Sequence, residues 1–204
     1  LETEVLRTVS KNKANDLCRV RLQLYAKGGG LYSNESRQPE FIIECFAIEP
    51  DTLLLNSNGL TAGIATGVNK SADTLSNLKS CNALIYAVAA RQAKANKWND
   101  ALIRNTTGNI IESTIANIFW IKEGELYTPP LPEGCVAGVM RRYVLNTVTV
   151  TEKVLDEQTL LAADEVFVTN AIKGIKWVKS IGEREYSNQV TQNIFNAVLN
   201  NQTI

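Results

Sequence analysis

The hydrophobic and polar positions of this chain follow two periodicities, one typical of strands and the other typical of helices. Polar and apolar side chains alternate along residues 18–25, as they do in a strand with one covered face. Strand patterns recur at residues 40–48, 61–68, 149–155, 165–169 and 175–181. Helices are expected at residues 1–13, 79–96, 141–148, 157–163 and 190–200. The mixture predicts an α+β fold.

Residues 108–142 carry the pattern around which the rest of the chain is organised. A hairpin that turns at residues 106–108 is expected to end at Glu112, and a second hairpin turns at Glu123 and Gly124. Gly138 then stands just before a predicted helix. A carboxylate at a strand end can orient a cationic group, and a helix that begins at a Gly offers free backbone N–H groups to a phosphate. The two features together would suit pyridoxal phosphate (PLP).

Five segments of the chain occur in a recognisable order. They are LKSCN at 78–82, ESTIANIFW at 112–120, LYTP at 126–129, GVMR at 138–141 and DEVFVTNA at 164–171. In this order they resemble the class IV PLP-dependent aminotransferases and lyases, a group that holds branched-chain aminotransferases, D-amino-acid aminotransferases and 4-amino-4-deoxychorismate lyases. The resemblance implies the D-amino-acid aminotransferase-like fold, fold type IV. It further implies that residues 1–50 are a remnant of the smaller N-terminal domain and residues 51–204 the larger PLP-binding domain.

The chain opens at Leu1, inside a predicted amphipathic helix, and not at an initiator Met. Members of the resembled family carry a further N-terminal segment that supplies the phosphate-binding Arg. We therefore expect the sequence to be a truncated form, with processing to a mature chain as the alternative.

The resemblance also assigns roles to residues of the cofactor site. Lys79 is expected to form the Schiff base with PLP and then to move a proton at the substrate Cα, while Glu112 keeps the ring nitrogen protonated. The phosphate is expected at Val139, Met140, Thr169, Asn170 and Ala171. Several transaminases of the family place a hydroxyl residue where Ala171 stands, whereas lyases resemble the Asn-Ala form found here. Without the resemblance, Lys79 is a solvated surface Lys and Glu112 a strand-end charge that faces water.

Three further residues are candidates for the substrate side of the site. Lys27 heads a Gly-rich turn where some family members hold the substrate carboxylate with an Arg, and the alternative is a surface Lys beside a turn. Tyr32 follows in the same turn and is expected to reach the neighbouring site of a homodimer, because family members dimerise and share loops. Thr114 lies in the elbow that follows Glu112.

Three functions stay open at this level. The leading one is a PLP-dependent aminotransferase that moves an amino group between an amino acid, hydrophobic or branched-chain, and a 2-oxo acid. The second is a 4-amino-4-deoxychorismate lyase, which forms 4-aminobenzoate and pyruvate. The third is a non-catalytic PLP-binding protein, against which the presence of both Lys79 and Glu112 argues.

Composition removes several other classes of protein. The 204 residues carry 21 basic and 21 acidic side chains, and this balance gives no electrostatic footprint for nucleic acid or an anionic membrane. The chain contains no His, so His triads, His bases and His metal sites are excluded, and no metal is expected. No apolar run is long enough to span a bilayer. Reduced thiols of a cytoplasmic protein are indicated by the scattered positions of Cys18, Cys45, Cys81 and Cys135.

Overall fold

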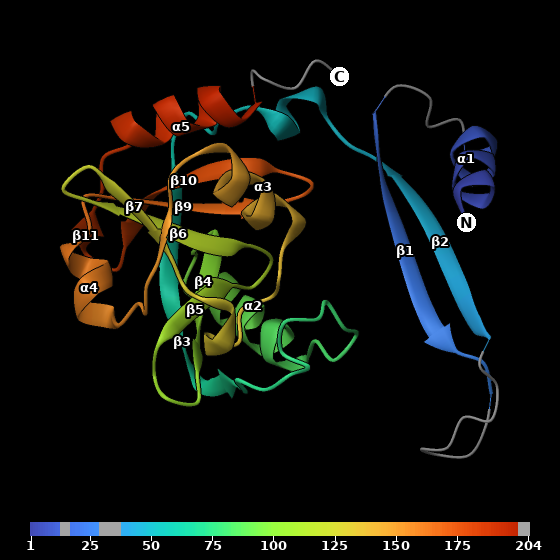
Figure 1. Ribbon diagram of the computed structural model, residues 1–204, viewed down its shortest axis with the longest axis horizontal. Coiled ribbons are helices and arrows are strands. Elements are labelled where there is room, and N and C mark those ends of the chain that lie inside the picture. Colours follow the sequence, from blue (N-terminus) through green and yellow to red (C-terminus); the bar gives the residue numbers. More distant parts are fainter. Residues whose placement is uncertain (13–16, 29–37, 200–204) are drawn as a thin grey trace. The chain divides into compact units, whose positions relative to one another are not determined.

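The computed structural model describes residues 1–12, 17–28 and 38–199, which divide into two compact units (Figure 1). The units are Leu1–Thr52 and Leu53–Ile204, and the 3-10 turn η1 (Pro50–Leu53) spans their boundary. None of the helices within the described ranges has the length and apolar character that crossing a membrane requires.

The first unit is an antiparallel hairpin with one helix. α1 (Glu2–Lys11) precedes β1 (Cys18–Ala26) and β2 (Pro39–Ala47), whose register pairs Val20 with Cys45. Residues that face each other across two strands share a face, so this pair lies on the apolar side of the hairpin. The ion pair between Arg21 and Glu44 lies on the opposite side. The predicted strand at residues 18–25 is therefore confirmed.

Strand pairing closes most of the second unit's sheet on itself. Its strands are β3 (Leu60–Lys70), β4 (Asp100–Asn105), β5 (Ile110–Ser113), β6 (Asn117–Lys122), β7 (Glu125–Thr128), β8 (Thr151–Glu152), β9 (Glu165–Asn170), β10 (Gly174–Ile181) and β11 (Arg184–Glu185). The ladder runs β11-β10-β3-β4-β5-β6-β7-β8, and β9 pairs with both β10 and β6. The part from β10 through β3, β4, β5 and β6 to β9 is thus a closed ring, and closure removes the unpaired edges that an open sheet would expose.

Helices cover this sheet from more than one side (Figure 1). They are α2 (Leu84–Ala95), α3 (Val139–Thr147), α4 (Glu157–Ala162) and α5 (Gln189–Leu199), with the 3-10 turn η2 (Leu131–Glu133) before α3. One apolar layer joins Leu102, Ile118 and Trp120 of the strands to Leu160 of α4. The mixed helix and sheet architecture confirms the predicted α+β fold.

The opposite layer holds the strand side chains that position the site. We call it the α2–α3 face, and its strand residues are Ala65, Ala101, Ile103, Phe119 and Phe167. α2 packs on it through Ala89 and Ala93, and α3 packs on it through Met140 and Val144. The rings of Phe119 and Phe167 stack with centroids 4.9 Å apart. Two helices are therefore fixed on one face of the sheet, α2 against β3 and β4 and α3 against β9.

Two local expectations changed in the structure, and one was confirmed. The β6–β7 hairpin turns at Glu123 (φ 54) and Gly124 (φ 83), the left-handed conformations that a type I′ turn requires. The helix expected from residue 79 begins at Leu84, because tight turns hold the backbone at Leu78 and Ser80. The strand expected at residues 149–155 shortens to β8. Lys79 consequently lies on a loop and not on a helix.

Candidate active site

Three polar side chains form a row across the α2–α3 face. Glu112 of β5 faces Asn117 of β6, and Asn117 faces Thr169 of β9. Directly opposed residues of neighbouring strands point to the same side of a sheet, so the three side chains lie in line. All three are buried. A buried polar row interrupts an otherwise apolar face, which is the usual mark of a ligand site and not of a core.

Residues 136–138 cross over this row and connect its members. The backbone N–H of Val136 donates to Glu112 Oε2 at 2.8 Å, and Asn117 Nδ2 donates to the Val136 carbonyl oxygen at 2.8 Å. A Cβ atom at Gly138 would lie 2.1 Å from Asn117 Oδ1, so a side chain at this position would displace Asn117. The Gly before α3 therefore permits the backbone to approach the row closely.

α3 begins beside Asn117, the middle residue of the row. Gly138 is the N-cap and makes no side-chain cap, so the first backbone N–H groups, at Val139 and Met140, have no partner within the helix. α3 contacts β9, whose Thr169 Oγ1 is buried and has no hydrogen-bond partner in the part of the chain that the structure describes. Donors of this kind at a helix start are suited to an anion such as a phosphate.

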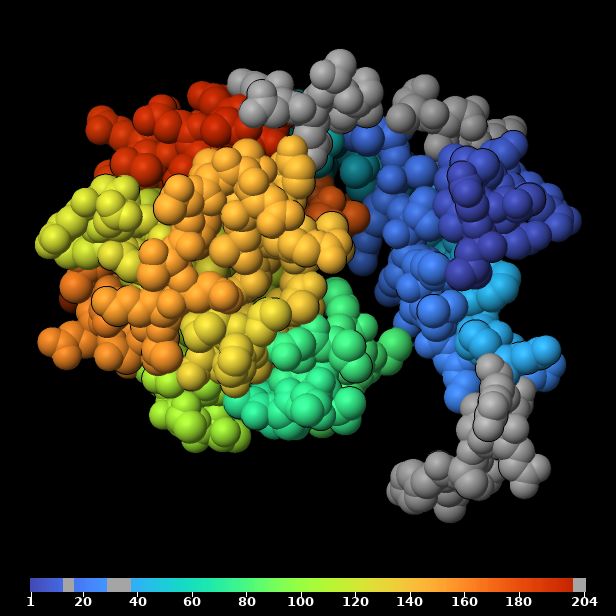
Figure 2. Space-filling view, viewed as in Figure 1, coloured from blue at the N-terminus to red at the C-terminus, as the bar shows by residue number. Residues whose placement is uncertain are grey.

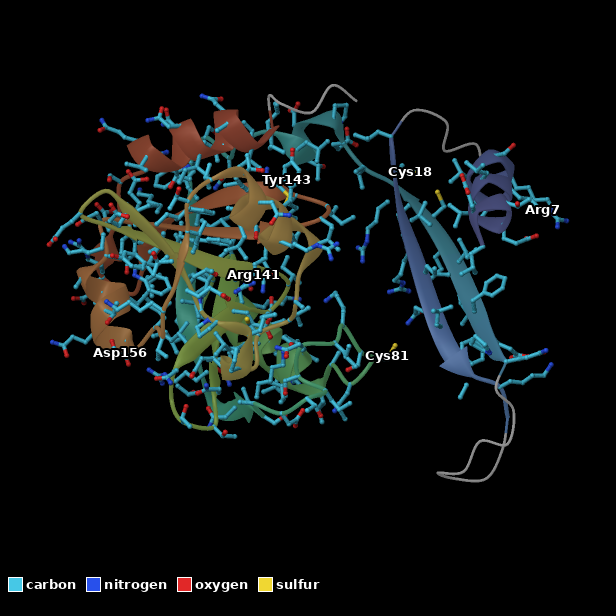
Figure 3. All side chains as sticks on the ribbon, in the orientation of Figure 1. Arg7, Cys18, Cys81, Arg141, Tyr143 and Asp156 are labelled. Atoms are coloured by element: carbon cyan, nitrogen blue, oxygen red, sulfur yellow. The ribbon has the colours of Figure 1, made fainter. Side chains whose placement is uncertain are left out.

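Arg141 anchors this end of α3. Its side chain lies within the second unit (Figure 3), is 4% exposed, and donates from Nη2 to the Pro129 carbonyl oxygen at 2.9 Å. It also forms an ion pair with Glu152. These contacts use Nη2, whereas the buried Nε of Arg141 has no hydrogen-bond partner within the described residues.

Glu112 is held from its other side by Lys70 and Tyr86. Lys70 Nζ lies 2.6 Å from Oε1 of Glu112, and the Tyr86 hydroxyl donates to the same oxygen at 2.7 Å. Burial raises the pKa of Tyr86 above its ordinary value, and the negative charge of Glu112 and their hydrogen bond raise it further. The phenol therefore stays protonated and remains a donor to the carboxylate throughout the physiological pH range.

α2 carries Tyr86 to Glu112. Its small residues Ala89 and Ala93 let the helix lie close to β3 and β4, where Ile103 is the residue that faces Glu112 across the strands. Tyr86 stands about one turn before Ala89 and about two turns before Ala93, on the same side of the helix. The phenol thus reaches the Glu112 end of the row.

Lys79 lies on the loop between β3 and α2, exposed at the edge of a cavity of about 340 Å³. Lys70, Tyr86 and Val136, which all contact or flank Glu112, line the same cavity. No ion pair within the described residues involves Lys79. The exposed amine of Lys79 therefore lines the same cavity as Lys70 and Tyr86, the two side chains that bind the Glu112 carboxylate.

Asn77 ties the loop that carries Lys79 to the segment before α3. Its Nδ2 donates to the carbonyl oxygens of Leu131 and Cys135 at 2.8 Å and 2.7 Å, and Ala137 N donates to its backbone oxygen at 2.9 Å. In Figure 2 the green surface of the loop adjoins the yellow surface of this segment. Lys79 is therefore positioned relative to Glu112 and α3 by hydrogen bonds two residues away.

Comparison with known proteins shows the family to which this chain belongs. The family model for amino-transferase class IV matches residues 1–181. The chain belongs to the class IV aminotransferase family. This confirms the resemblance and the fold type that the sequence motifs predicted.

Relatives within the family carry two different activities in their names. An aminodeoxychorismate lyase of Vibrio harveyi is 31% identical over 166 residues, which is 78% of this chain and 60% of the relative. A provisionally named branched-chain-amino-acid aminotransferase of Methanocaldococcus jannaschii is 30% identical over 191 residues, 91% of this chain and 66% of the relative. The chain thus spans less than two thirds of the length of either protein.

Solved structures share the fold of this class IV chain. A branched-chain amino acid aminotransferase of Thermobaculum terrenum in its PLP form superposes with a TM-score of 0.81 at 22% identity, covering 94% of this chain and 67% of that one. At this level of identity the likeness establishes the fold alone.

The structure brings together most of the predicted cofactor residues of this class IV chain. Glu112 and Thr169 share the row, Val139 and Met140 start α3, and Lys79 lies at the cavity. The Asn170 side chain accepts from the backbone of Ile172 and Lys173, and exposed Ala171 follows it. The chain thus turns away from the sheet after Asn170, the last residue of β9.

The predicted substrate residues lie in three different settings. The Thr114 hydroxyl donates to buried Asp100 at 2.5 Å, so this hydroxyl already has an acceptor. Lys27 belongs to the first unit, where its Nζ lies 3.4 Å from Glu40. Tyr32 lies outside the described residues. Their roles toward a substrate remain predictions.

Sequence reasoning missed Lys70, Tyr86 and Asn77. Lys70 was hidden because the predicted strand ended at residue 68, whereas β3 extends to Lys70. Tyr86 stands in an apolar helical pattern that indicates core packing. Asn77 lies in a polar loop, and the composition of such a loop does not show whether an Asn side chain bonds another segment or faces solvent.

We expect Asn77→Ala to lower the free energy of unfolding by about 1–3 kcal/mol, since two carbonyl oxygens lose their donor. Urea unfolding of the purified protein measures the loss, and hydrogen exchange at Ala137 N–H should become faster. Asn193→Ala on the exposed side of α5 is the matched control and should change stability by less than about 0.5 kcal/mol. Unchanged stability together with unchanged exchange at Ala137 would show that Asn77 does not clasp the loop.

Proposed function

We propose that this protein is a PLP-dependent enzyme whose primary reaction is transfer of an amino group between a hydrophobic or branched-chain amino acid and a 2-oxo acid. The observation that carries the proposal is the polar row on the α2–α3 face, with a carboxylate at one end and unpaired donors at the other. PLP carries a basic ring nitrogen and an anionic phosphate on the same ring, so the chemistry of the row fits it.

The phosphate is assigned to the α3 end of the row. Val139 and Met140 offer backbone N–H groups, and Thr169 offers a buried hydroxyl without an acceptor. A phosphate would supply that acceptor. Leaving a buried hydroxyl unsatisfied costs about 1–3 kcal/mol, so a bound anion at this place also stabilises the fold.

The ring nitrogen is assigned to Glu112. Its Oε1 already accepts from Lys70 and Tyr86, whereas Oε2 accepts from Val136 and, in the described part of the chain, from no second donor. A carboxylate oxygen has two lone pairs, so Oε2 retains one for a protonated ring nitrogen. Glu112 can then hold positive charge on the ring.

Lys79, and not Lys70, is assigned as the amine that bonds the cofactor. Lys70 is buried in an ion pair with Glu112, which keeps its protons engaged. Lys79 is exposed at the cavity, and no ion pair within the described residues involves it, so its amine is free to bond a cofactor there. When bound, PLP supplies the electron sink for the bond that breaks at the substrate Cα. The Lys79 amine is the group that accepts and returns the Cα proton.

A lyase that acts on aminodeoxychorismate is the second candidate. It is favoured by the Vibrio harveyi relative of that name and by the Asn170-Ala171 pair at the strand end. Both reactions begin with loss of the proton from the substrate Cα, and both need the same anchors for PLP, namely Lys79, Glu112 and the phosphate site at the start of α3. They differ in the fate of the electrons, since elimination expels pyruvate and needs no 2-oxo acid.

We further propose that the active protein is a cytoplasmic homodimer in which residues 1–50 belong to a smaller N-terminal domain. Support comes from exposed apolar side chains on the hairpin, namely Leu22, Leu24, Phe41, Ile42 and Phe46, which favour burial against another surface. The reduced thiols of Cys18, Cys45 and Cys135 support the cytoplasm. In this arrangement Lys27, Tyr32 and Thr114 select the substrate.

Paired assays test the reaction directly. The purified protein loaded with PLP should form glutamate from leucine and 2-oxoglutarate, and this outcome supports the transaminase. Formation of 4-aminobenzoate and pyruvate from aminodeoxychorismate without any oxo acid would instead establish the lyase. Lys79→Ala is the control and should form no product in either assay. If neither product appears although the protein binds PLP, both substrate assignments are wrong.

We expect Glu112→Gln to retain PLP but to react on the order of 100-fold more slowly with amino acid. The amide is nearly the same size, yet it has no charge with which to hold a protonated ring nitrogen. Stopped-flow absorbance of the first half-reaction measures the rate constant without depending on the second substrate. A wild-type rate constant in this variant would remove Glu112 from the mechanism.

A further inference from the structure

Lys70 reaches Glu112 because the register of β3 changes along its length. β3 pairs Ile64 with Leu102 and then Asn69 with Arg104, so five positions on β3 correspond to two on β4. Without this irregularity Gly67 would stand opposite Asn105, where Lys70 stands instead. The extra residues place a long basic side chain on the α2–α3 face, beside the strand pair that ends at Glu112.

The Lys70 amine is enclosed by two groups. It lies 2.6 Å from Glu112 Oε1 and 5.4 Å from the centre of the Tyr86 ring, and its side chain is 10% exposed. An aromatic face attracts a cation, so Tyr86 favours the charged amine through its ring and the charged carboxylate through its hydroxyl. The three side chains form a closed unit in which each fixes the other two.

The two oxygens of Glu112 are therefore used differently. Oε1 receives both side-chain donors, Lys70 and Tyr86, and Oε2 receives the backbone of Val136. Side-chain donors on Oε1 stop the carboxylate from rotating about its last bond, because rotation would break two charge-assisted hydrogen bonds at once. Oε2 is consequently the oxygen whose direction is fixed for a further partner.

We infer that Lys70 and Tyr86 are positioning residues that hold Glu112 so that Oε2 faces the ring nitrogen of bound PLP, an inference that rests on the proposed function. Neither side chain bonds the cofactor or the substrate in this role. Lys70 supplies the compensating charge that lets a carboxylate stay buried, and Tyr86 supplies the second donor that sets its orientation. The affinity for PLP then depends on Lys70 and Tyr86, which act only through Glu112.

The alternative is that the Lys70–Glu112 pair only ties the end of β3 to the sheet. A purely structural pair would change stability when broken but would leave the affinity for PLP and the absorption spectrum of bound PLP unchanged in any variant that folds. A positioning pair changes both of these, and the change is reversed by a residue that keeps the charge.

The test compares Lys70→Met, Lys70→Arg and Tyr86→Phe in the full chain by titration with PLP, followed by absorbance. We expect Lys70→Met to raise the Kd for PLP at least about tenfold, the lower end of what a hydrogen bond to a charged group contributes, and to shift the visible band of bound PLP. Lys70→Arg should restore most of the affinity and the band. Tyr86→Phe should fall between the wild type and Lys70→Met.

Lys122→Met is the matched control, because Lys122 Nζ lies 3.1 Å from Asp164 in an ion pair on another part of the unit. It should bind PLP as the wild type does. Urea unfolding of each variant shows which are folded. If Lys70→Met does not fold, Tyr86→Phe decides, since it keeps the ring beside Lys70 and removes only the hydroxyl.

Wild-type Kd and wild-type absorption in a folded Lys70→Met, or in a folded Tyr86→Phe when Lys70→Met does not fold, would overturn the inference and leave the proposed function intact. Failure of Lys70→Arg to recover either quantity would also overturn it, because the charge would then not be the relevant property. A wild-type protein that binds no PLP would overturn the proposed function and the inference together, and the titration of the wild type shows this first.

Discussion

The buried carboxylate of Glu112 is the constraint on which the rest of the second unit depends. A charge taken out of water must be paired and hydrogen-bonded, or the fold loses several kcal/mol. Its donors come from Lys70, Tyr86 and Val136, which are 42, 26 and 24 residues away along the chain. Satisfying one side chain therefore brings together the end of β3, the first turn of α2 and the segment before α3. The cavity beside Lys79 lies among these same segments.

Apolar packing on the α2–α3 face positions the two helices that flank the polar row. Ala89 and Ala93 allow α2 to lie close to the strands, while Met140 and Val144 seat α3 on the stacked Phe119 and Phe167 rings. Each helix then presents its first turn to the polar row. The two helices beside the polar row are thus fixed by ordinary apolar contacts.

Much of the fold and of the candidate site could be predicted from the sequence. The features that could not be predicted depend on contacts between segments that lie far apart along the chain. The alternation at residues 18–25, the turn at Glu123-Gly124 and the Gly before α3 each report local backbone geometry, which the structure confirms. Lys70 could not be predicted because its placement depends on a register irregularity between β3 and β4, two strands that α2 and its loop separate along the chain. The helix start could not be placed, since no side-chain cap marks it. The hydroxyl of Thr114 is engaged by Asp100, a contact that requires the tertiary fold.

The central claim is that Lys79, on a loop clasped by Asn77, is the amine that meets a cofactor whose ring is held at Glu112. The most direct measurement is borohydride reduction of the protein in the presence of PLP, which fixes any bond between a lysine and the cofactor, followed by peptide mass spectrometry. The account predicts that the added mass is found in a peptide that contains Lys79 and not Lys70, and that it is absent after Lys79→Ala. Label on Lys70, or equal label spread over several lysines, would contradict the account.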